Sequence, residues 1–332
     1  MTMMRSSENT VAIVTTLRNA GKVLDSFVAY HRAIGFAHLF LFFDDPADPD
    51  LLRARAMPDV TAFACDAALR ETWKTLPAYA LYGAGVNSEV MSRQLLNVDY
   101  AMGLAREHGH QWLLNIDVDE LFFAPSQSVD EHFAALRATP IETVSYLNYE
   151  AVPEHDEIND YFREVDLFKL PFGAVQQHLA QPLARAQQIA PQLKPFFHFY
   201  SNGKSAVRLT GTPPRPAGVH QFQHAGRATV AAASQRQFVL HYACCGFETF
   251  WKKYTTLGRF DDRWWGRHDI AASIGTFHLE ARDVVMNGGR DQALAFYRER
   301  LAISDRHRAD ELIRLGLLTR FDQPRKIIAR GA

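Results

Sequence analysis

Short apolar runs recur along the first half of the chain and are separated by segments of a different spacing. Residues 11 to 17 (VAIVTTL) and 38 to 43 (HLFLFF) are largely continuous apolar stretches, the pattern of a strand buried on both faces. Further short strands are predicted at 60 to 64 and 111 to 116. The second run ends in DDPADPD, where prolines and aspartates stop any regular element.

Two of the intervening segments have helical spacing. Residues 22 to 35 place apolar side chains on one face, at Val23, Phe27, Tyr30 and Ile34. Residues 87 to 108 predict a longer helix, which Asn87 or Ser88 can cap, with its face at Val90, Leu95, Val98, Met102 and Ala105. Alternating strands and helices predict an α/β fold whose mostly parallel sheet is covered by helices on both faces. Ligands bind such sheets beyond the carboxyl ends of the strands.

The second half of the chain has a less regular pattern. A strand is predicted at 141 to 149, and strand-like pieces follow at 196 to 200, 205 to 209 and 237 to 242. Residues 171 to 195 are rich in Gln, Ala and Pro, which predicts an insertion or a lid. Helical patterns return at 246 to 257 and from about 290 to the end. No repeat and no long low-complexity linker marks a domain boundary.

Composition adds constraints on partners and location. With 332 residues and 47% hydrophobic content, the chain can bury a sizeable core. Thirty-six basic and 37 acidic residues leave a formal charge of -1, so bulk charge predicts neither a nucleic-acid partner nor an anionic membrane. The absence of a signal or transmembrane pattern predicts a cytoplasmic protein, with peripheral membrane contact left open. The three cysteines, Cys65, Cys244 and Cys245, are interpreted as reduced and buried.

The predicted strand at 111 to 116 ends in a dense group of acids. NIDVDELFF, residues 115 to 123, contains Asp117, Asp119 and Glu120. In extended backbone, residues two apart point to the same side, so Asp117 and Asp119 would face one point while Val118 turns back into the protein. Two carboxylates on one side suit Mg²⁺ or Mn²⁺, which complete their coordination shell with water and phosphate.

The same acids permit other interpretations. A D-x-D triplet is short, and a solvated strand end whose acids cap the next element has the same sequence. A calcium loop is disfavoured because Leu121-Phe122-Phe123 follow where that loop needs a glycine. The predicted sheet favours a ligand site, because its strand ends would bring three polar stretches to one crevice: Arg18-Asn19, Asp44-Asp45 and residues 117 to 120.

The longer stretch QWLLNIDVDELFF resembles the D-x-D strand end of glycosyltransferases with the GT-A fold, in the branch of family 2-like and family 92 enzymes. VAIVTTLRNAGKVLDSFVAYHRAIGFAHLFLFFDD resembles the branch's opening strand, its helix with a Tyr-His pair, and its second strand ending in acids. The long helix with Arg93-Gln94 resembles the donor-side helix, and SNGKSAVR, GVHQF and HYACCGFETFWKKY resemble later segments. The resemblance covers most of residues 11 to 257.

This resemblance implies a Rossmann-like sheet and transfer of a sugar from a nucleoside diphosphate sugar, UDP-sugar above all, to a saccharide or glycosylated acceptor, with inversion. It implies a domain over 1–260, with a donor half at about 11–124 and an acceptor half at about 125–260, and a helical extension over 261–332 packed on it. Mn²⁺ or Mg²⁺ would be held by Asp117, Asp119 and His241, with His220 and His224 as competing histidines. Glu120 would orient the loop or a ribose hydroxyl, or act as a plain helix-start acid. The remaining donor-binding residues would be Thr16, Arg18, Asn19, Asp44, Asp45, Arg93, Gln94, Lys204 and Arg208, together with Asp117.

Several assignments stay open. The general base could be Glu154, Asp156 or Glu248, and surface acids at a helix start would have the same pattern. An acceptor groove could be lined by Trp251, Tyr254, Trp264 and Trp265, or these residues could pack in a core. Asn19-Ala20 and Cys244-Cys245 depart from the family pattern. The rival functions are a phosphohydrolase with Asp117 as nucleophile and a catalytically degenerate sugar-binding protein.

Overall fold

The computed structural model describes residues 11–171, 181–182, 184–185, 202–264, 268–269 and 277–331, and for 264 and 268–269 it describes only the backbone. The chain divides into two compact units. The first unit comprises Met1–Leu147, Gly203–Val239 and Gly331–Ala332, and the second comprises Asn148–Asn202 and Leu240–Arg330. Each unit is described by itself below.

The first unit is built on a seven-stranded sheet with the order β12-β6-β9-β4-β1-β2-β3. Its strands are β1 (Val11–Leu17), β2 (His38–Phe43), β3 (Val60–Ala64), β4 (Trp112–Asn115), β6 (Thr143–Tyr146), β9 (Lys204–Arg208) and β12 (Ala231–Ala233). Strands β3, β2, β1 and β4 run parallel, as do β6 and β12, while β9 is antiparallel to both of its neighbours. The predicted α/β fold with a mostly parallel sheet is therefore confirmed.

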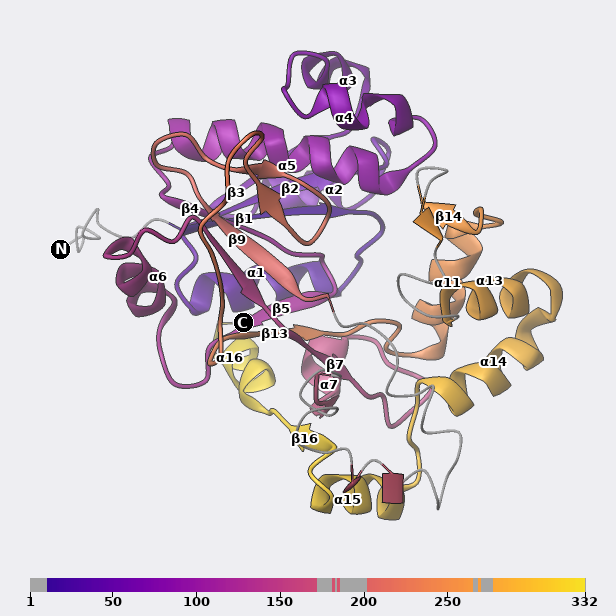
Figure 1. Cartoon of the computed structure of the whole chain (residues 1–332). Helices are drawn as coiled ribbons and strands as arrows, with labels where there is room; N and C mark the ends of the chain where they lie inside the picture. Colours follow the sequence, from indigo (N-terminus) through magenta and orange to yellow (C-terminus); the bar gives the residue numbers. More distant parts are fainter. Residues whose placement is uncertain are drawn as a thin grey trace. The chain divides into compact units, whose positions relative to one another are not determined.

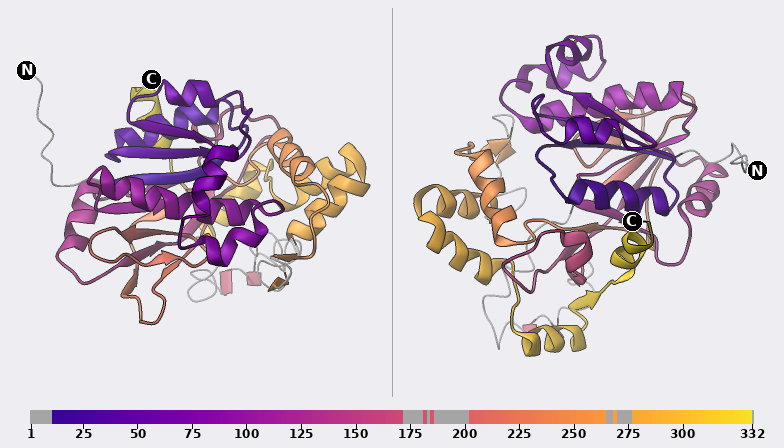
Figure 2. Two further views of the ribbon diagram at one scale, coloured as in Figure 1. Left: turned by 90° about the horizontal axis from the view of Figure 1, so that it is seen from above. Right: turned by 180° about the vertical axis from the view of Figure 1, so that it is seen from behind.

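Helices cover both faces of this sheet. Figures 1 and 2 show α5 (Val90–Glu107) along one face and α1 (Val23–Ala33) along the other. Alternate residues of β1 point to opposite faces, and Val11, Ala12, Ile13 and Val14 are all buried. A strand covered on both sides must be apolar on both sides, which explains why the apolar runs of the sequence located β1 and β2 without error.

The long helix is shorter than predicted. It begins at Val90 with Glu89 as the N-cap residue, and neither Asn87 nor Ser88 caps it. Val90 is exposed, whereas Leu95, Val98, Met102 and Ala105 form the buried face. The chain before it forms α3 (Ala67–Trp73), α4 (Tyr79–Tyr82) and a 3-10 turn (Gly83–Gly85), none of which the sequence pattern predicted. These elements are too short to show a helical period.

The first unit contains further elements next to the sheet. They are α2 (Leu51–Arg55), β5 (Glu120–Phe123), α6 (Val129–Arg137) and the hairpin strands β10 (Arg215–Pro216) and β11 (Phe222–Gln223). Helix α6 begins with a complete capping box between Ser128 and Glu131, because each residue bonds to the backbone N–H of the other.

The second unit combines short strands with helices. Strands β16 (Leu318–Arg320), β8 (Leu167–Lys169), β7 (Asn148–Ala151) and β13 (Phe238–His241) lie next to one another in that order, and of β13 only Leu240 and His241 belong to this unit. Helices α11 (Phe247–Leu257), α13 (Phe277–Asn287) and α14 (Gly289–Arg300) share one apolar core, and α15 (Arg306–Arg314) packs with β8 and β16 in another. The remaining elements are α7 (Tyr161–Glu164), α16 (Gln323–Gly331) and the paired strands β14 (Arg263–Trp264) and β15 (His268–Asp269).

Several predictions for the second half need correction. The single strand predicted at 141 to 149 is two strands, β6 and β7, separated at the exposed Leu147. The helical pattern near the end is interrupted by β16, whose pairing with β8 is a long-range contact that local spacing cannot report. Most of the predicted insertion at 171 to 195, the predicted strand at 196 to 200 and Trp265 lie outside the described residues. None of the helices that the structure describes has the length and apolar character needed to cross a bilayer.

Candidate functional site

The carboxyl ends of three parallel strands meet at one edge of the first unit's sheet. Leu17 at the end of β1 pairs with Phe43 at the end of β2, and Asn115 at the end of β4 lies beside Val14. The antiparallel β9 brings its first residue, Lys204, to this same edge, because Ser205 pairs with Asn115. Polar residues that follow β1, β2 and β4 thus gather where the sequence predicted a ligand site.

The acids after β4 form a turn. The strand ends at Asn115, and the turn over residues 117 to 120 is closed by the Glu120 N–H donating to the Asp117 carbonyl at 3.1 Å. The Glu120 carboxylate in turn accepts from the Asp117 N–H at 2.7 Å, so Glu120 orients the loop. The extended backbone predicted for residues 117 to 119 was wrong, because residues 118 and 119 form a turn before β5 starts at Glu120.

Asp117 is held by two side chains from distant elements. Lys204 Nζ lies 2.5 Å from Asp117 Oδ2, and Gln94 Nε2 donates to Oδ1 at 2.5 Å. Lys204 also lies 3.6 Å from Glu120, and its side chain is 2% exposed. Burial alone would lower the pKa of Lys204, but the charges of Asp117, Glu120 and Asp119 raise it above its ordinary value. Lys204 is therefore a buried, charged counter-ion of the acidic turn.

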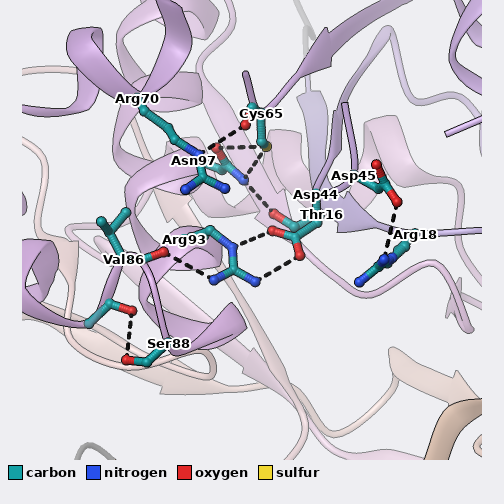
Figure 3. Close-up of polar contacts among 11 residues, drawn as sticks. Thr16, Arg18, Asp44, Asp45, Cys65, Arg70, Val86, Ser88, Arg93 and Asn97 are labelled. Atoms are coloured by element: carbon teal, nitrogen blue, oxygen red, sulfur yellow. Dashed lines mark hydrogen bonds and ion pairs between the residues drawn. The ribbon is translucent and has the colours of Figure 1, made fainter. Parts of the chain in front are cut away.

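Arg93 and Asp44 form a closed pair, visible in Figure 3. Arg93 donates from Nε to Asp44 Oδ1 at 2.5 Å and from Nη2 to Oδ2 at 2.8 Å, and its Nη1 donates to the Val86 carbonyl at 3.1 Å. The two side chains are only 14% and 8% exposed. The guanidinium predicted to hold a phosphate and the acid predicted to bind a nucleoside thus satisfy each other, and together they tie α5 to the end of β2.

One turn farther along α5, Asn97 bridges β1 and Cys65, the residue that follows β3. Its Nδ2 donates to Thr16 Oγ1 at 3.0 Å and lies 3.5 Å from Cys65 Sγ, as Figure 3 shows. Burial raises the pKa of the Cys65 thiol to about 12, which makes it an inert packing residue. Thr16 is half-buried at the end of β1, so it lies at the predicted donor edge. Asn97 was not predicted, because a single asparagine in a helical pattern carries no signal.

The loop after β2 clamps the loop after β1. Asp48 accepts from the Asn19 N–H at 2.5 Å and Asp50 accepts from the Gly21 N–H at 2.6 Å, while the exposed pair Arg18–Asp45 is 3.1 Å apart. Both N–H groups belong to residues with positive φ that lie between β1 and α1. Asp48 and Asp50 were not predicted as site residues, although DDPADPD contains them together with the predicted Asp45.

Arg208 has a structural task that argues against the predicted donor contact. It pairs with Trp112 at the far end of β9 from Lys204, so the two cations cannot both lie at the acidic edge. Its guanidinium donates to the carbonyls of Ile141, Leu136 and Thr139 at 2.8, 2.5 and 2.9 Å. It also lies 5.0 Å above the Trp112 ring. Arg208 therefore satisfies backbone carbonyls in the last turn of α6 and in the segment that follows it.

The candidate histidines lie in different surroundings. His220 follows β10, and its Nδ1 donates to the Gly203 carbonyl at 2.7 Å, next to Lys204. The adjacent backbone is fixed at the end of β4, because Asn115 donates to the Val219 carbonyl and Ser205 donates to the His220 carbonyl. His224 bonds to Glu142 instead. His241 belongs to the second unit, where its Nδ1 lies 3.2 Å from Glu150, which also pairs with the buried Lys169.

The three base candidates all belong to the second unit, and each is paired with an arginine. Glu154 pairs with Arg320, Asp156 with Arg298, and Glu248 with Arg290. The hydrogen bond from Arg320 lowers the pKa of Glu154, which weakens it as a base.

Two aromatic candidates for the acceptor groove lie on α11. Tyr254 is fully buried and its hydroxyl lies 2.7 Å from His278 Nδ1, so it is a core residue. Trp251 packs against the same core and lies under Arg290. The side chain of Trp264 lies outside the described part of the chain.

A divalent cation suits the charge of the acidic turn. Three carboxylates face one ammonium there, so the turn keeps a net negative charge after Lys204 is counted. Within the described ranges, no three His, Cys, Asp or Glu side chains form a ready ligand set. Mg²⁺ and Mn²⁺ do not need one, because they commonly use one or two carboxylates and take the remaining ligands from water and phosphate. Asp119 and Asp117 are the residues that would hold it.

Comparisons with known proteins agree with a transferase. No protein-family model matches the chain. Two proteins of Arabidopsis thaliana, each named glycosyltransferase-like, are 27% and 26% identical to it over 95% of its length. The chain spans 71% of the length of the first and 62% of the second. Similarity along almost the whole chain supports a glycosyltransferase.

One solved structure matches the chain at low similarity. It is glucosyl-3-phosphoglycerate synthase from Mycobacterium tuberculosis in complex with Mn²⁺, UDP and glucosyl-3-phosphoglycerate. The sequence identity is 14%, the TM-score is 0.26, and the alignment covers 61% of this chain and 58% of that one.

Proposed function

We propose that this chain transfers a sugar from a nucleoside diphosphate sugar, with UDP-sugar as the expected donor, to a hydroxyl of a saccharide or glycosylated acceptor. The observation that carries the proposal is the acidic turn at the carboxyl edge of the sheet, held by Lys204 and Gln94. Ligand sites of parallel α/β sheets lie at this edge. The glycosyltransferase-like relatives support the same reaction class.

The residues at this sheet edge have different roles in donor binding. Asp119, with Asp117, holds Mg²⁺ or Mn²⁺, which when bound would neutralise the charge that develops on the departing diphosphate. Gln94 and Lys204 fix the Asp117 carboxylate, and Glu120 fixes the backbone of the turn. Thr16, oriented by Asn97, presents a hydroxyl at the end of β1 to the nucleoside. Arg93 and Asp44 shape the site through their pairing and not by touching the donor.

The acceptor side needs a group that takes a proton. Inversion is the expected course, and a carboxylate then accepts the proton of the acceptor hydroxyl. Asp156 and Glu248 remain the candidates, since Glu154 is held as a weak base by Arg320. The half-buried Trp251 could contact a sugar ring of the acceptor.

Calorimetric titration with UDP tests the donor site. We expect UDP to bind when Mn²⁺ is present and to be released by EDTA, and we expect Asp119→Asn to weaken binding by about tenfold or more, the scale of a lost charged contact. Asp59→Asn is the matched control, because Asp59 precedes β3 at the opposite edge and pairs with Arg32. The proposal is overturned if UDP, GDP and the other nucleoside diphosphates all fail to bind with Mn²⁺ present.

A further inference from the structure

A helix on one face of the sheet holds the backbone that follows the acidic turn. Two neighbouring side chains of α1 bind both polar backbone groups of Phe122 in β5. The Tyr30 hydroxyl donates to the Phe122 carbonyl at 3.0 Å, and the Phe122 N–H donates to His31 Nε2 at 3.1 Å. Along this edge, α1 supplies to β5 the hydrogen bonds that a neighbouring strand would otherwise make.

The chemistry of His31 fixes its protonation. Its Nδ1 lies 2.9 Å from the Phe27 carbonyl, which can only accept, so Nδ1 carries the proton and Nε2 is the acceptor for Phe122. The imidazole is fully buried among the edges of Phe27, Tyr30 and Phe36. Burial lowers the pKa of His31 to about 3. A neutral imidazole of one tautomer is therefore built into the fold at this point.

Phe122 is closely linked to the candidate ligands. It lies two residues after Glu120, whose carboxylate binds the Asp117 N–H and lies beside Lys204. A shift of Phe122 along the strand would move Glu120 and open the turn. Since a carboxylate that is misplaced by about 1 Å loses much of its value in a binding site, the anchor of β5 sets how well the turn is formed.

We propose that Tyr30 and His31 are positioning residues for the acidic turn, and that their bonds to Phe122 determine its affinity for a divalent cation with a nucleoside diphosphate. This inference rests on the proposed function. It assigns no direct contact with the donor to either residue. It differs from a purely structural account, in which the pair would contribute stability and leave the affinity of the folded protein unchanged.

The structure offers a matched pair for the test. His132 and Tyr146 are also a buried His–Tyr pair, joined by a 2.9 Å hydrogen bond, and their rings pack on the ring of Phe122 at 6.2 and 5.0 Å. Burial lowers the pKa of His132 to about 4. This second pair thus shares the burial, the residue types and the neighbour, but in the described part of the chain its hydrogen bond joins the two side chains to each other and not to the backbone of Phe122.

The experiment compares Mn²⁺ affinity, measured by electron paramagnetic resonance with UDP present, across five variants. We expect His31→Phe to weaken Mn²⁺ binding by about tenfold or more, as loss of an outer support of a metal site commonly does, and Tyr30→Phe to weaken it by a smaller factor. His132→Phe and Tyr146→Phe should stay within about twofold of the unmodified protein, because they leave the backbone of the turn in place. His31→Gln, whose amide can both accept and donate, should recover part of the loss.

The possible outcomes distinguish failure of the positioning role from failure of the proposed function. Equal losses in the two pairs, or no loss in either, would overturn the positioning role while leaving the proposed function intact. An unmodified protein that binds no Mn²⁺ with UDP would overturn the proposed function itself. If His31→Phe fails to fold, Tyr30→Phe and Tyr146→Phe carry the comparison, since each removes only one hydroxyl. A loss in Tyr30→Phe alone supports the inference, and equal affinities refute it.

Discussion

The Nζ atom of Lys204 lies 2.5 Å from Oδ2 of Asp117, although the two residues are 87 positions apart in the chain. Asp117→Asn would remove the carboxylate that lies 2.5 Å from the buried ammonium and leave Glu120, at 3.6 Å, as its ion-pair partner. We expect the free energy of unfolding to fall by about 2 kcal/mol or more. This loss is small for a broken buried ion pair, because the Asp117 side chain is 36% exposed. Asp45→Asn, in an exposed pair with Arg18, should cost about 0.5 kcal/mol or less. Urea denaturation of both variants measures the difference, and equal costs would show that Lys204 is not held by Asp117.

Arg93 and Asp44 should be strongly coupled. Their two hydrogen bonds are nearly out of solvent, so a double-mutant cycle with Arg93→Ala and Asp44→Ala should give a coupling free energy of about 2 kcal/mol. The same cycle on Arg18 and Asp45, which are 47% and 33% exposed, should give less than about 1 kcal/mol. A coupling of the buried pair no larger than that of the exposed pair would leave Arg93 available to a phosphate, as the sequence had suggested.

Gly203 should tolerate no side chain. Its φ is +61°, and a Cβ there would lie 2.0 Å from the Tyr146 carbonyl oxygen, which is backbone and cannot move aside. Gly211 has a similar φ of +71° with open space around it. Gly211→Ala should therefore cost only the backbone strain, about 1 kcal/mol, whereas Gly203→Ala should cost several times more and displace Lys204. Thermal unfolding followed by circular dichroism distinguishes the two, and similar melting temperatures would contradict the close approach.

His31 predicts a specific loss of stability in acid. Its pKa is about 3 in the folded protein against an ordinary value of 6.5, so the unfolded chain takes up the proton first. The contribution to stability is complete above pH 6.5 and decreases as the pH falls toward 3, by about 1.4 kcal/mol for each pH unit. Between pH 7 and pH 5, unmodified protein should lose about 2 kcal/mol more than His31→Gln, since other buried histidines act equally in both. Identical pH profiles in denaturant titrations would disprove this.

The sequence predicted the fold correctly where burial alone determines the pattern of apolar residues. Strands β1 and β2 are apolar on both faces, so their limits were found at the correct residues. The small helices α3 and α4 were missed because seven and four residues contain too few turns for a period to appear. Strand β16 exists because β8 pairs with it across almost 150 positions, and no local signal predicts such a pairing.

The sequence predicted the location of the candidate site at the sheet edge better than it predicted the contacts among the site's residues. The acids after β2 and β4 could be assigned to one edge, because parallel strands end together. Which acid pairs with which base depends on the direction of β9 and on the rotation of α5. Because of these features, Asp44 pairs with Arg93, Asp117 pairs with Lys204, and Arg208 lies at the opposite edge of the sheet. Asp48 and Asp50 accept hydrogen bonds from backbone N–H groups, and the spacing of residues in the sequence does not predict such contacts.

The antiparallel entry of β9 also has a consequence during synthesis. Strands β1, β2 and β4 are complete well before Lys204 is made, and Lys204 follows Asp117 by 87 residues. At ribosomal rates this corresponds to roughly 4 to 17 s. Throughout that interval the acidic turn lacks the Lys204 ammonium, and β4 lacks the β9 strand that later pairs with it. The acidic turn therefore forms only after β9 has been inserted, which makes the site one of the last parts of the first unit to mature.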